Sequence, residues 1–545
     1  MLIGVFGCTR GSAPPLRAAG SPTPVVGGTL RYASENDVRS LDPAVGYDEV
    51  SAEVMNLVFD GLLRFDAGTT LEPALAESFS RSEDGRTYTF VLRPGLRFHN
   101  GRAVVAEDVV QSWARLFDPR LASPGADFFR LVEGAEARLQ GDPTAPLGLS
   151  APDARTVVVR LRGPDPTFLS VVAMSFGAVV PIEEVEARGE RWFMEPVGTG
   201  PFTLESWQMG GELVLRRNPD YWEPGLPYLD TIVRESNVPR DLQLLRMEAG
   251  ELHQTYRLSA PDYLWVKSEP AWAAQLLEYP STDTYGEFMN TELKPFDNVW
   301  FRRAVSAAID RDKLRKIQNG RALPTVSWVP PSLEGHLVWA ELSPEEQADL
   351  QYQRHDPALA RRCLAEAGYP DGYPGPPIDY WTINTSGALM TAMSVQADLA
   401  EIGVPIEIRN TTFSAYLSAT GRRGAVAMGY GAWSMDYPHQ RNFLEPRFHS
   451  RNIADENSSN ETFFSDPEVD AWLDAAARSL DPAEQTARYR LAHRRIAREA
   501  PYAFEYHSLS ISLTQPALRG FRSSSLVQRD PRRAWLDLPP GEVTR

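Results

Sequence analysis

Cysteine is nearly absent from this 545-residue chain, which contains only Cys8 and Cys363. Two cysteines cannot build a disulfide framework, nor a zinc or iron–sulfur site that needs several thiolates. Positive charge is also scarce. The 55 lysines and arginines are outnumbered by 72 aspartates and glutamates, which gives a net charge of −17. Because the sequence has no basic block, we exclude nucleic acid as a partner, and anionic lipid headgroups would repel the chain.

The sequence has no hydrophobic run long enough to cross a bilayer. The most apolar internal stretch, residues 167–182, is interrupted by Gly177 and Pro181 and falls short of the roughly 20 residues that a spanning helix needs. We therefore expect a buried helix or strand of a core there. The composition, 43% hydrophobic and 23% charged residues, is that of a folded globular protein. The length predicts about three or four structural units.

Motifs that indicate catalysis are absent as well. The chain has no G-x-x-x-x-G-K-[ST] phosphate loop, no G-x-S-x-G nucleophile elbow and no H-E-x-x-H zinc helix. Gly198-Thr199-Gly200 lacks the third glycine, the strand and the helix of a dinucleotide-binding fingerprint, so we interpret it as a turn. His439 and His449 could share a metal, but isolated histidines are more often satisfied by the core. We predict no catalytic residue, cofactor or metal site, and we interpret Cys363 as a buried, inert thiol.

The first residues indicate export. Residues 1–8 are an apolar run that ends in a small residue and then Cys8. This pattern resembles a bacterial lipoprotein cleavage site, in which Cys8 becomes the lipidated first residue of the mature chain. The alternative is an irregular N-terminus with a chance cysteine. Residues 9–26 are rich in Pro, Gly, Ser and Ala, which predicts a flexible tether. We therefore expect residues 1–26 to be a signal remnant and tether that keep a folded domain near a membrane.

The rest of the chain has the pattern of an α/β protein. Runs of β-branched and aromatic residues next to turn signals predict strands, and apolar residues at i, i+3, i+4 and i+7 predict helices. The clearest helix includes residues 301–309, with Asp297 or Asn298 as its cap, and the Asp481-Pro482 pair separates two later helices. The strands are expected at 29–32, 87–92, 156–161 and 213–216, and the other helices at 106–117, 357–367, 470–480 and 486–500.

A boundary between structural units is indicated at residues 279–283. A strand-like segment, 276–279, is followed by Pro280 and a polar stretch before residues 285–290. Proline would end a strand that needs every backbone donor of its ladder. A crossover between two lobes would fit this pattern, and an ordinary loop within one domain is the alternative.

Aromatic side chains in a polar, glycine-rich segment form the candidate binding site. The segment contains Tyr430, Trp433, Met435, Asp436 and Tyr437. Glycines allow the backbone to approach a ligand closely, the aromatic rings offer flat apolar walls, and Asp436 offers one fixed charge. This combination suits an amphipathic ligand with an ammonium group. From composition alone, a loop with a core tryptophan and a solvated aspartate is equally consistent.

Several longer motifs resemble one known family. The chain is similar to the extracytoplasmic solute-binding proteins of ABC importers, in the large family of oligopeptide-, dipeptide- and nickel-binding proteins. The similarity extends from about Gly28 to about Phe521. The most diagnostic run is Tyr88 to Gly101 (YTFVLRPGLRFHNG) with Ala106-Glu107-Asp108-Val109 after it. Other matching segments are 27–30, 41–44, 58–62, 73–78, 197–202 and 218–222, together with Asn290, 295–297, 302–304 and 308–311.

The resemblance implies an α/β fold of two lobes, a periplasmic-binding-protein fold of class II or cluster C. Two crossing segments would form the hinge, and an extra subdomain would be attached to the first lobe. The implied boundaries are 27–70, 195–278 and 505–545 for lobe I, 71–194 for the subdomain, and 279–504 for lobe II. Motifs such as Phe98-His99-Asn100-Gly101 are then expected to form the fold rather than to touch ligand.

The resemblance also implies a function. Ligand would enter a cleft, the lobes would close, and the closed monomer would dock on the transmembrane permease subunits of an importer, outside the cytoplasm. Trp433-Ser434-Met435-Asp436 resembles the W-x-x-D motif of the family, whose aspartate pairs with the α-ammonium of a peptide. The resemblance therefore assigns Asp436 to the ammonium group and Trp433 to a pocket wall, with Met435, Tyr437 and Tyr430 nearby.

One departure from the family bears on the ligand. Dipeptide binders carry an arginine, after the strand that corresponds to residues 378–381, that grips the ligand carboxylate. Residues 382–387 contain no arginine, so we expect oligopeptides rather than strict dipeptides. A nickel chelate, for which His439 is a possible ligand, and an oligosaccharide are alternatives within the family. A secreted hydrolase and a sensor that does not transport are alternatives outside it.

Overall fold

The computed structural model describes residues 18, 20–21, 23–66, 68–524, 526 and 529–538. Cys8 lies outside these residues, so its lipidation stays a prediction. Within the described ranges, no helix has both the length and the apolarity to span a membrane. The apolar stretch 167–182 forms a short buried helix, α5 (Phe168–Val172), followed by a 3₁₀ turn. The expectation of a core element there is confirmed.

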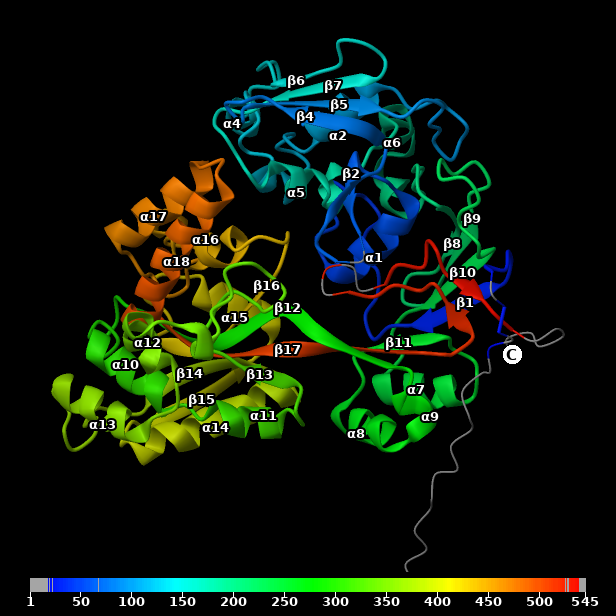
Figure 1. The fold of residues 1–545 in the computed structure, drawn as a ribbon. Coiled ribbons are helices and arrows are strands. Elements are labelled where there is room, and N and C mark those ends of the chain that lie inside the picture. Colours follow the sequence, from blue (N-terminus) through cyan, green and yellow to red (C-terminus); the bar gives the residue numbers. More distant parts are fainter. Residues whose placement is uncertain are drawn as a thin grey trace, which may run out of the picture.

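One mixed sheet of eleven strands runs through most of the molecule. We use "lobe I" for the part built on β1 and β8 to β11, and "lobe II" for the part built on β13 to β16; β12 and β17 belong to both (Figure 1). In spatial order the strands are β15 (Ile406–Thr411), β14 (Ile378–Ile383), β16 (Met428–Ser434), β12 (Leu276–Met289), β17 (Tyr502–Thr514), β11 (Gln254–Tyr256), β1 (Thr29–Ala33), β10 (Thr231–Glu235), β9 (Glu212–Arg217) and β8 (Phe202–Trp207), and β13 (Ala322–Pro324) pairs with β17.

The long strands β12 and β17 join the two lobes. They pair antiparallel along nearly their whole length, and Figure 1 shows them crossing from one lobe to the other. The prediction that Pro280 ends a strand is wrong. Strand β12 continues through Pro280, which lies opposite Leu509, and the register shifts between Pro280 and Thr284. Such an irregularity accommodates a residue that cannot donate to the ladder.

Lobe II is a sheet covered on both faces by helices. One face packs on α10 (Val299–Ala308), α11 (Arg311–Ile317), α13 (Pro357–Glu366) and α14 (Ser386–Glu401). The other face packs on α12 (Pro344–Leu350), α15 (Phe413–Thr420), α16 (Arg441–Phe448), α17 (Pro467–Arg478) and α18 (Pro482–Glu499). The second half of β12 and most of β17 are buried, whereas the edge strand β15 alternates buried and exposed side chains over its first residues.

Helix caps account for the observed helix starts. Asn298 caps α10 by accepting a hydrogen bond from the backbone N–H of Trp300, as predicted. Helices α17 and α18 begin three and four residues earlier than the apolar periodicity indicates. In each, an aspartate accepts backbone hydrogen bonds of the first turn and a proline takes the first helical position, where its missing N–H is not needed.

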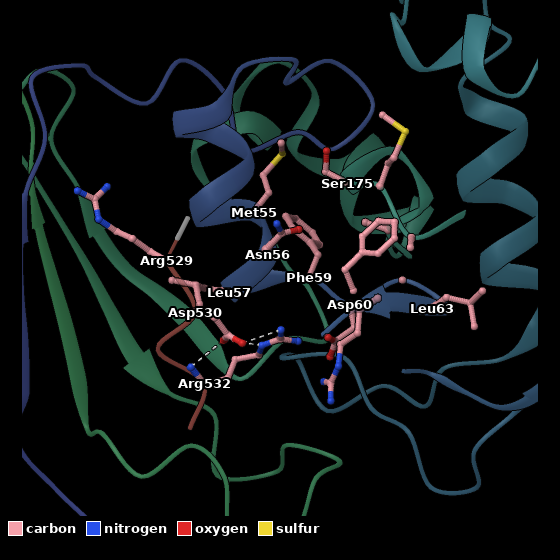
Figure 2. Close-up of a pocket in the computed structure, with 16 residues that line it drawn as sticks. Met55, Asn56, Leu57, Phe59, Asp60, Leu63, Ser175, Arg529, Asp530 and Arg532 are labelled. Carbon is pink, nitrogen blue, oxygen red and sulfur yellow. Dashed lines mark hydrogen bonds and ion pairs between the residues drawn. The ribbon is translucent and has the colours of Figure 1, made fainter. Parts of the chain in front are cut away.

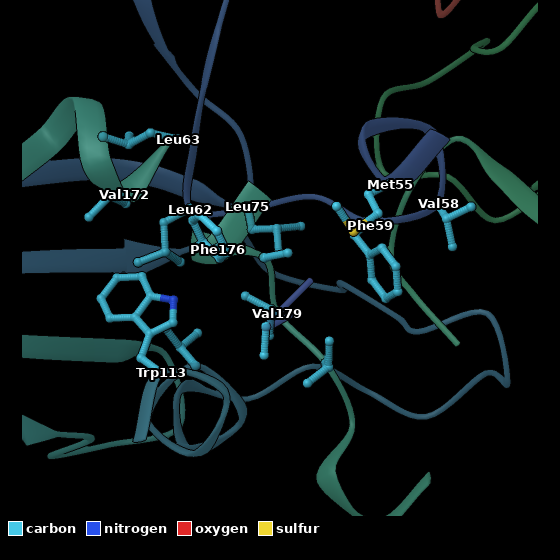
Figure 3. Packing of buried hydrophobic residues seen from close by; sticks show 14 of the residues in the cluster. Met55, Val58, Phe59, Leu62, Leu63, Leu75, Trp113, Val172, Phe176 and Val179 are labelled. Carbon is cyan, nitrogen blue, oxygen red and sulfur yellow. The ribbon is translucent and has the colours of Figure 1, made fainter. Parts of the chain in front are cut away.

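A separate four-stranded sheet forms a subdomain that packs against lobe I, at the top of Figure 1. One continuous hydrophobic cluster joins the two parts, and it includes Met55 and Val58 of lobe I and Trp113 and Phe176 of the subdomain (Figure 3). The subdomain therefore has no core of its own to separate it from lobe I. Its sheet order is β4 (Ala76–Arg81), β5 (Thr87–Leu92), β7 (Thr156–Arg160) and β6 (Leu149–Ser150), and its helices are α2 (Ala106–Arg115), α3 (Gly125–Phe128), α4 (Ala135–Leu139), α5 and α6 (Ile182–Arg188).

Short elements complete the fold. On lobe I these are α1 (Glu49–Val58), α7 (Arg240–Glu248), α8 (Ala260–Ser268) and α9 (Pro270–Ala273), with the small two-stranded pairs β2 (Leu63–Phe65) with β3 (Leu71–Pro73) and β18 (Leu518–Arg519) with β19 (Trp535–Leu536). The exact sequence boundaries of the lobes and the subdomain stay predictions.

The glycine-rich motif at residues 197–202 serves the fold. A Cβ on Gly198 would lie 1.9 Å from the carbonyl oxygen of Val58, at the end of α1. His99 of the most diagnostic motif accepts a hydrogen bond from the Gly198 N–H at 3.2 Å, and its Nε2 lies 3.0 Å from the Gly200 oxygen. Burial lowers the pKa of His99 to about 4. These contacts support the expectation that both motifs are structural.

Candidate functional site between the lobes

Asp436 follows strand β16 and is fixed by a neighbouring asparagine. The Asn442 Nδ2 donates to Asp436 Oδ2 at 2.9 Å, and the Asp436 backbone N–H donates to Asn442 Oδ1 at 2.8 Å. The Trp433 indole N–H also donates to Asn442 Oδ1, at 3.4 Å. Asn442, which lies on α16, thus orients the aspartate and the tryptophan together. Sequence reasoning missed Asn442, because a polar residue in a helix carries no signal of its own.

Tyr47 of lobe I reaches across to the second oxygen of the Asp436 carboxylate. Its hydroxyl donates to Asp436 Oδ1 at 2.5 Å, although the two residues are 389 positions apart in the chain. Tyr47 keeps 52% of its surface exposed, so this contact is open to solvent. It places the carboxylate at the junction of the lobes.

The charge of Asp436 is not balanced by a protein cation. In the ranges that the structure describes, its side-chain partners are the neutral donors Asn442 and Tyr47, and it makes no ion pair. Partial burial raises the pKa of Asp436 above its ordinary value, and the two hydrogen bonds act against that rise. A carboxylate that is held in place, accessible and uncompensated attracts a cationic group, and an ammonium group can also donate hydrogen bonds to it.

Two further contacts bring lobe II against the subdomain. Tyr437 is buried and meets the ring of Phe128 edge to face, with centroids 6.3 Å apart. The Arg441 Nη1 lies 3.1 Å from Asp165 Oδ1. Together with the bond between Tyr47 and Asp436, these contacts join lobe II to lobe I and to the subdomain. Tyr437 therefore contributes its ring to the contact between the lobes.

The other predicted aromatic residues lie on two different faces of β16. Trp433 is half-buried, and the guanidinium of Arg447 covers its ring at 4.8 Å. Tyr430 stacks on Tyr285 of β12, with centroids 6.0 Å apart. Successive side chains of a strand point to opposite faces, so residues 430 and 433 cannot line the same wall. Met435 is half-buried and packs against the same hydrophobic cluster as Trp433.

A polar cluster on the hinge strands adjoins the segment of Asp436. The Ser434 hydroxyl donates to Asp283 Oδ1 at 2.6 Å, and Ser281 and Ser508 donate to Asp283 Oδ2 at 3.0 and 3.4 Å. Asp283 lies on β12 and Ser508 on β17. The polar stretch after Pro280 was the sequence signal for this region. The sequence did not indicate which residues this stretch would contact.

The histidines and the buried cysteine have other surroundings. His439 contacts Gln485 at 3.3 Å, whereas His449 contacts Asp470 at 3.2 Å and Asp474 at 3.3 Å. Within the described ranges, no three His, Cys, Asp or Glu side chains are grouped so as to hold a metal ion. Cys363 is buried as predicted, and burial raises the pKa of its thiol to about 11.

A pocket beside α1 is distinct from the site of Asp436. Figure 2 shows it between α1, the loop at Ser175 and the C-terminal segment that carries Arg529 and Arg532. Its charged groups already have protein partners: Arg529 pairs with Glu53 at 2.6 Å, and Arg532 pairs with Asp530 at 2.8 Å. These pairs are buried, and Arg529 and Glu53 are each only 6% exposed, which indicates that the charges serve the fold and that the pocket is not the candidate site.

Several known proteins are similar to this chain. It is 29% identical over 472 residues to the glutathione-binding protein GsiB of Escherichia coli (strain K12), a match that covers 85% of this chain and 86% of that protein. It is also similar to two solved structures. The periplasmic binding protein DppA of Helicobacter pylori, in complex with the peptide STSA, is 26% identical with a TM-score of 0.76, over 94% of this chain and 99% of that one. The clavulanic acid biosynthesis oligopeptide binding protein 2 is 25% identical with a TM-score of 0.85, over 96% of this chain and 99% of that one.

The family is shown by a match to most of the chain. Residues 70–455 match the model of the bacterial extracellular solute-binding proteins, family 5 Middle. The resemblance stated from the motifs is therefore confirmed, as is the α/β fold of the cluster C binding proteins. The family is one of solute binders rather than enzymes. This chain belongs to the bacterial extracellular solute-binding proteins of family 5.

Proposed function

We propose that this protein is the solute-capturing component of an ABC importer and that its ligand is a peptide with a free α-ammonium group. The ammonium group binds Asp436 between the lobes, with Trp433 and Met435 in the adjoining wall. Tyr437 supports the contact between lobe II and the subdomain, and Tyr430 supports β16 from its opposite face. The closed form delivers the peptide to the transmembrane permease subunits.

The single observation that carries this proposal is the uncompensated carboxylate of Asp436. Its two partners come from opposite lobes, Asn442 from lobe II and Tyr47 from lobe I. A ligand ammonium at the same carboxylate would contact both lobes only when they are closed. Binding would therefore shift the population toward the closed state, which is the state that a permease can distinguish from the open one.

The relatives support a peptide as the ligand. One is described as a glutathione-binding protein, one was solved with the peptide STSA, and one is described as an oligopeptide binding protein. Glutathione is itself a short peptide with a free amino group. An unmodified peptide carries an α-ammonium group, and that is the group that Asp436 is suited to bind.

The remaining parts of the proposal concern place and assembly. The family description is extracellular, and a relative is described as periplasmic and associated with an ABC transporter. We therefore place this protein outside the cytoplasm, as a monomer, with the lipidated Cys8 as an anchor. The location of Cys8 outside the described residues leaves this anchor to be tested by mass analysis of the mature chain.

The test compares free-amine and N-acetylated peptides on matched variants. Ligand-stripped protein is titrated by calorimetry with di-, tri- and tetrapeptides in both forms. Loss of a buried charge partner costs about 2–5 kcal/mol, so Asp436→Asn should weaken binding of the free amines by about thirtyfold or more. Acetylation should weaken binding to the wild type similarly and should have little further effect on the variant. Asp379→Asn, on the exposed side of β14, where Asp379 pairs with Arg409 at 3.0 Å, is the control and should bind like the wild type.

Other outcomes would change the assignment. Equal binding of the free and acetylated peptides to the wild type would remove the ammonium role from Asp436. Thermal stabilisation by nickel chelates or oligosaccharides, with none by peptides, would keep the family and overturn the ligand. At a hundredfold excess over Kd, a true ligand should stabilise the protein by about 2.7 kcal/mol.

A further inference from the structure

Arg257 has an unusual backbone conformation at the junction of the lobes. It follows β11 of lobe I, and its φ of +64° lies in the left-handed region, which is uncommon for residues other than glycine. Its backbone N–H donates to the Ile511 carbonyl of β17 at 2.9 Å. Strained backbone of this kind is often found where a side chain must be aimed at a ligand.

The guanidinium of Arg257 is accessible and only partly used. The side chain is 43% exposed, and its Nη2 donates to Glu49 at 3.0 Å. Over the described ranges, this is its only side-chain hydrogen bond and ion pair. The planar group has five N–H donors, so most of them remain free for a second carboxylate. The guanidinium carbon of Arg257 lies 5.4 Å from the centre of the Tyr256 ring, and this cation–π contact orients the group.

Arg257 and Asp436 belong to opposite lobes, and each contacts the segment of lobe I that contains Tyr47 and Glu49. Burial disfavours the charged guanidinium, but Glu49 and, on β12, Asp283 raise the pKa of Arg257 above its ordinary value. Asp283 in turn accepts a hydrogen bond from Ser434, two residues before Asp436. Asp283 therefore acts electrostatically on Arg257 and is hydrogen-bonded to the strand that leads to Asp436.

The chain of lobe I sets the scale of the distance between the two charges. Tyr47 contacts Asp436, and Glu49, two residues later, contacts Arg257. Two residues of chain extend at most about 7 Å between Cα atoms. The side chains of Tyr47 and Glu49 and their two hydrogen bonds add to this distance. Because an extended peptide advances about 3.3–3.6 Å per residue, the limited separation of the two charges fits a short peptide rather than a long one.

We propose that Arg257 binds the carboxylate of the peptide whose ammonium group Asp436 binds, so that the protein selects short peptides with both termini free. This inference rests on the proposed function. It assigns the carboxylate to an arginine on lobe I, in place of the arginine that is absent from residues 382–387 of lobe II. Because Asp436 is on lobe II and Arg257 is on lobe I, a peptide that binds both residues would also favour the closed state.

The experiment separates the two ends of the ligand. Each peptide of the di-, tri- and tetrapeptide panel is titrated as the free acid, the C-terminal amide and the N-acetyl acid. Hydrogen bonds to a charged group predict that amidation weakens binding to the wild type by about tenfold or more. In Arg257→Gln the free acid should bind about as weakly as the amide, and the effect of acetylation should persist. Arg257→Asn, which tolerates a left-handed backbone, is the second variant and should behave alike.

Two controls isolate the role of Arg257. Arg240→Gln removes a lobe I arginine that pairs with Glu35, and it should leave the difference between acid and amide unchanged. Glu49→Gln removes the carboxylate that pairs with the Arg257 guanidinium. This variant should increase the difference in affinity between the free acid and the amide.

The outcomes distinguish this inference from the function on which it rests. If the wild type binds acid and amide equally while acetylation still weakens binding, the role of Arg257 is overturned and that of Asp436 stands. If both Arg257 variants still prefer the free acid to the amide, another group binds the carboxylate. That result also overturns the role of Arg257. If no peptide of the panel binds, both proposals fall.

Discussion

The ion pair between Asp165 and Arg441 should control how readily the lobes close. Asp165 belongs to the subdomain and Arg441 to lobe II, and their side chains are only 6% and 18% exposed. Asp165→Asn is the sharpest perturbation. Asp165 Oδ1 also accepts hydrogen bonds from the Thr167 N–H at 2.9 Å and its hydroxyl at 2.7 Å. An asparagine oxygen can keep those bonds, so the variant removes the charge and preserves the local turn.

The magnitude follows from what remains in the variant. Arg441 still pairs with Glu445 at 2.5 Å, so no buried cation is left without a partner, and the full penalty for breaking a buried pair does not apply. Arg441 contacts the same Oδ1 that an asparagine would keep, so the loss is that of the charge on the acceptor and is at most about 2 kcal/mol, the value of a hydrogen bond to a charged group. This shifts the ratio of closed to open molecules by up to about thirtyfold. Because only the closed state makes every ligand contact, the measured Kd should rise by up to the same factor.

The assay is calorimetric Kd together with small-angle scattering of the ligand-free protein. Asp165→Asn should weaken binding and increase the radius of gyration, with little change in the unfolding midpoint. The matched control is Asp142→Asn. Asp142 makes the same local bonds to Thr144, at 2.9 and 2.7 Å, within the same subdomain. A lower unfolding midpoint for Asp165→Asn with an unchanged Kd would refute the reasoning, because the pair would then support the fold and not closure.

Two further predictions concern stability. Glu287 and Glu505 are fully buried side by side in lobe II. Burial raises the pKa of both carboxyl groups, that of Glu505 to about 7. Repulsion from Glu505 raises the pKa of Glu287 further. Since the folded state holds their protons more tightly than the unfolded state, stability should fall as the pH rises above about 4.5, by about 1.4 kcal/mol for each tenfold difference in proton affinity. Glu287→Gln should therefore raise the unfolding midpoint more at pH 8 than at pH 5, and an equal effect at both would contradict this sign. Gly198→Ala should destabilise strongly, because its Cβ would lie 1.9 Å from the Val58 oxygen, whereas Gly163→Ala, which meets nothing within 4 Å, should be neutral in the same thermal unfolding assay.

Local patterns in the sequence determined much of the fold. The i, i+3, i+4 spacing of residues 301–309 requires one buried helix face, and α10 has it, with Asn298 as the predicted cap. Motifs such as residues 88–101 indicated the family because their side chains satisfy backbone groups of the fold itself, as the contacts of His99 illustrate. Pro280 shows the limit of such reasoning. Its missing donor is a local fact, but whether a strand can accommodate it depends on the partner strand β17.

The candidate site depended on contacts that no local pattern encodes. The sequence by itself singled out Asp436 and the aromatic residues around it. Only the tertiary structure brought Tyr47 to Asp436 across 389 residues and separated Tyr430 from Trp433 onto opposite faces of β16. Arg257 had no sequence signal, because an arginine after a short strand is ordinary until the fold brings it to Glu49, 208 positions away in the chain. Periodicity reports which face of one element is buried, whereas a binding site is made where elements distant in the chain meet.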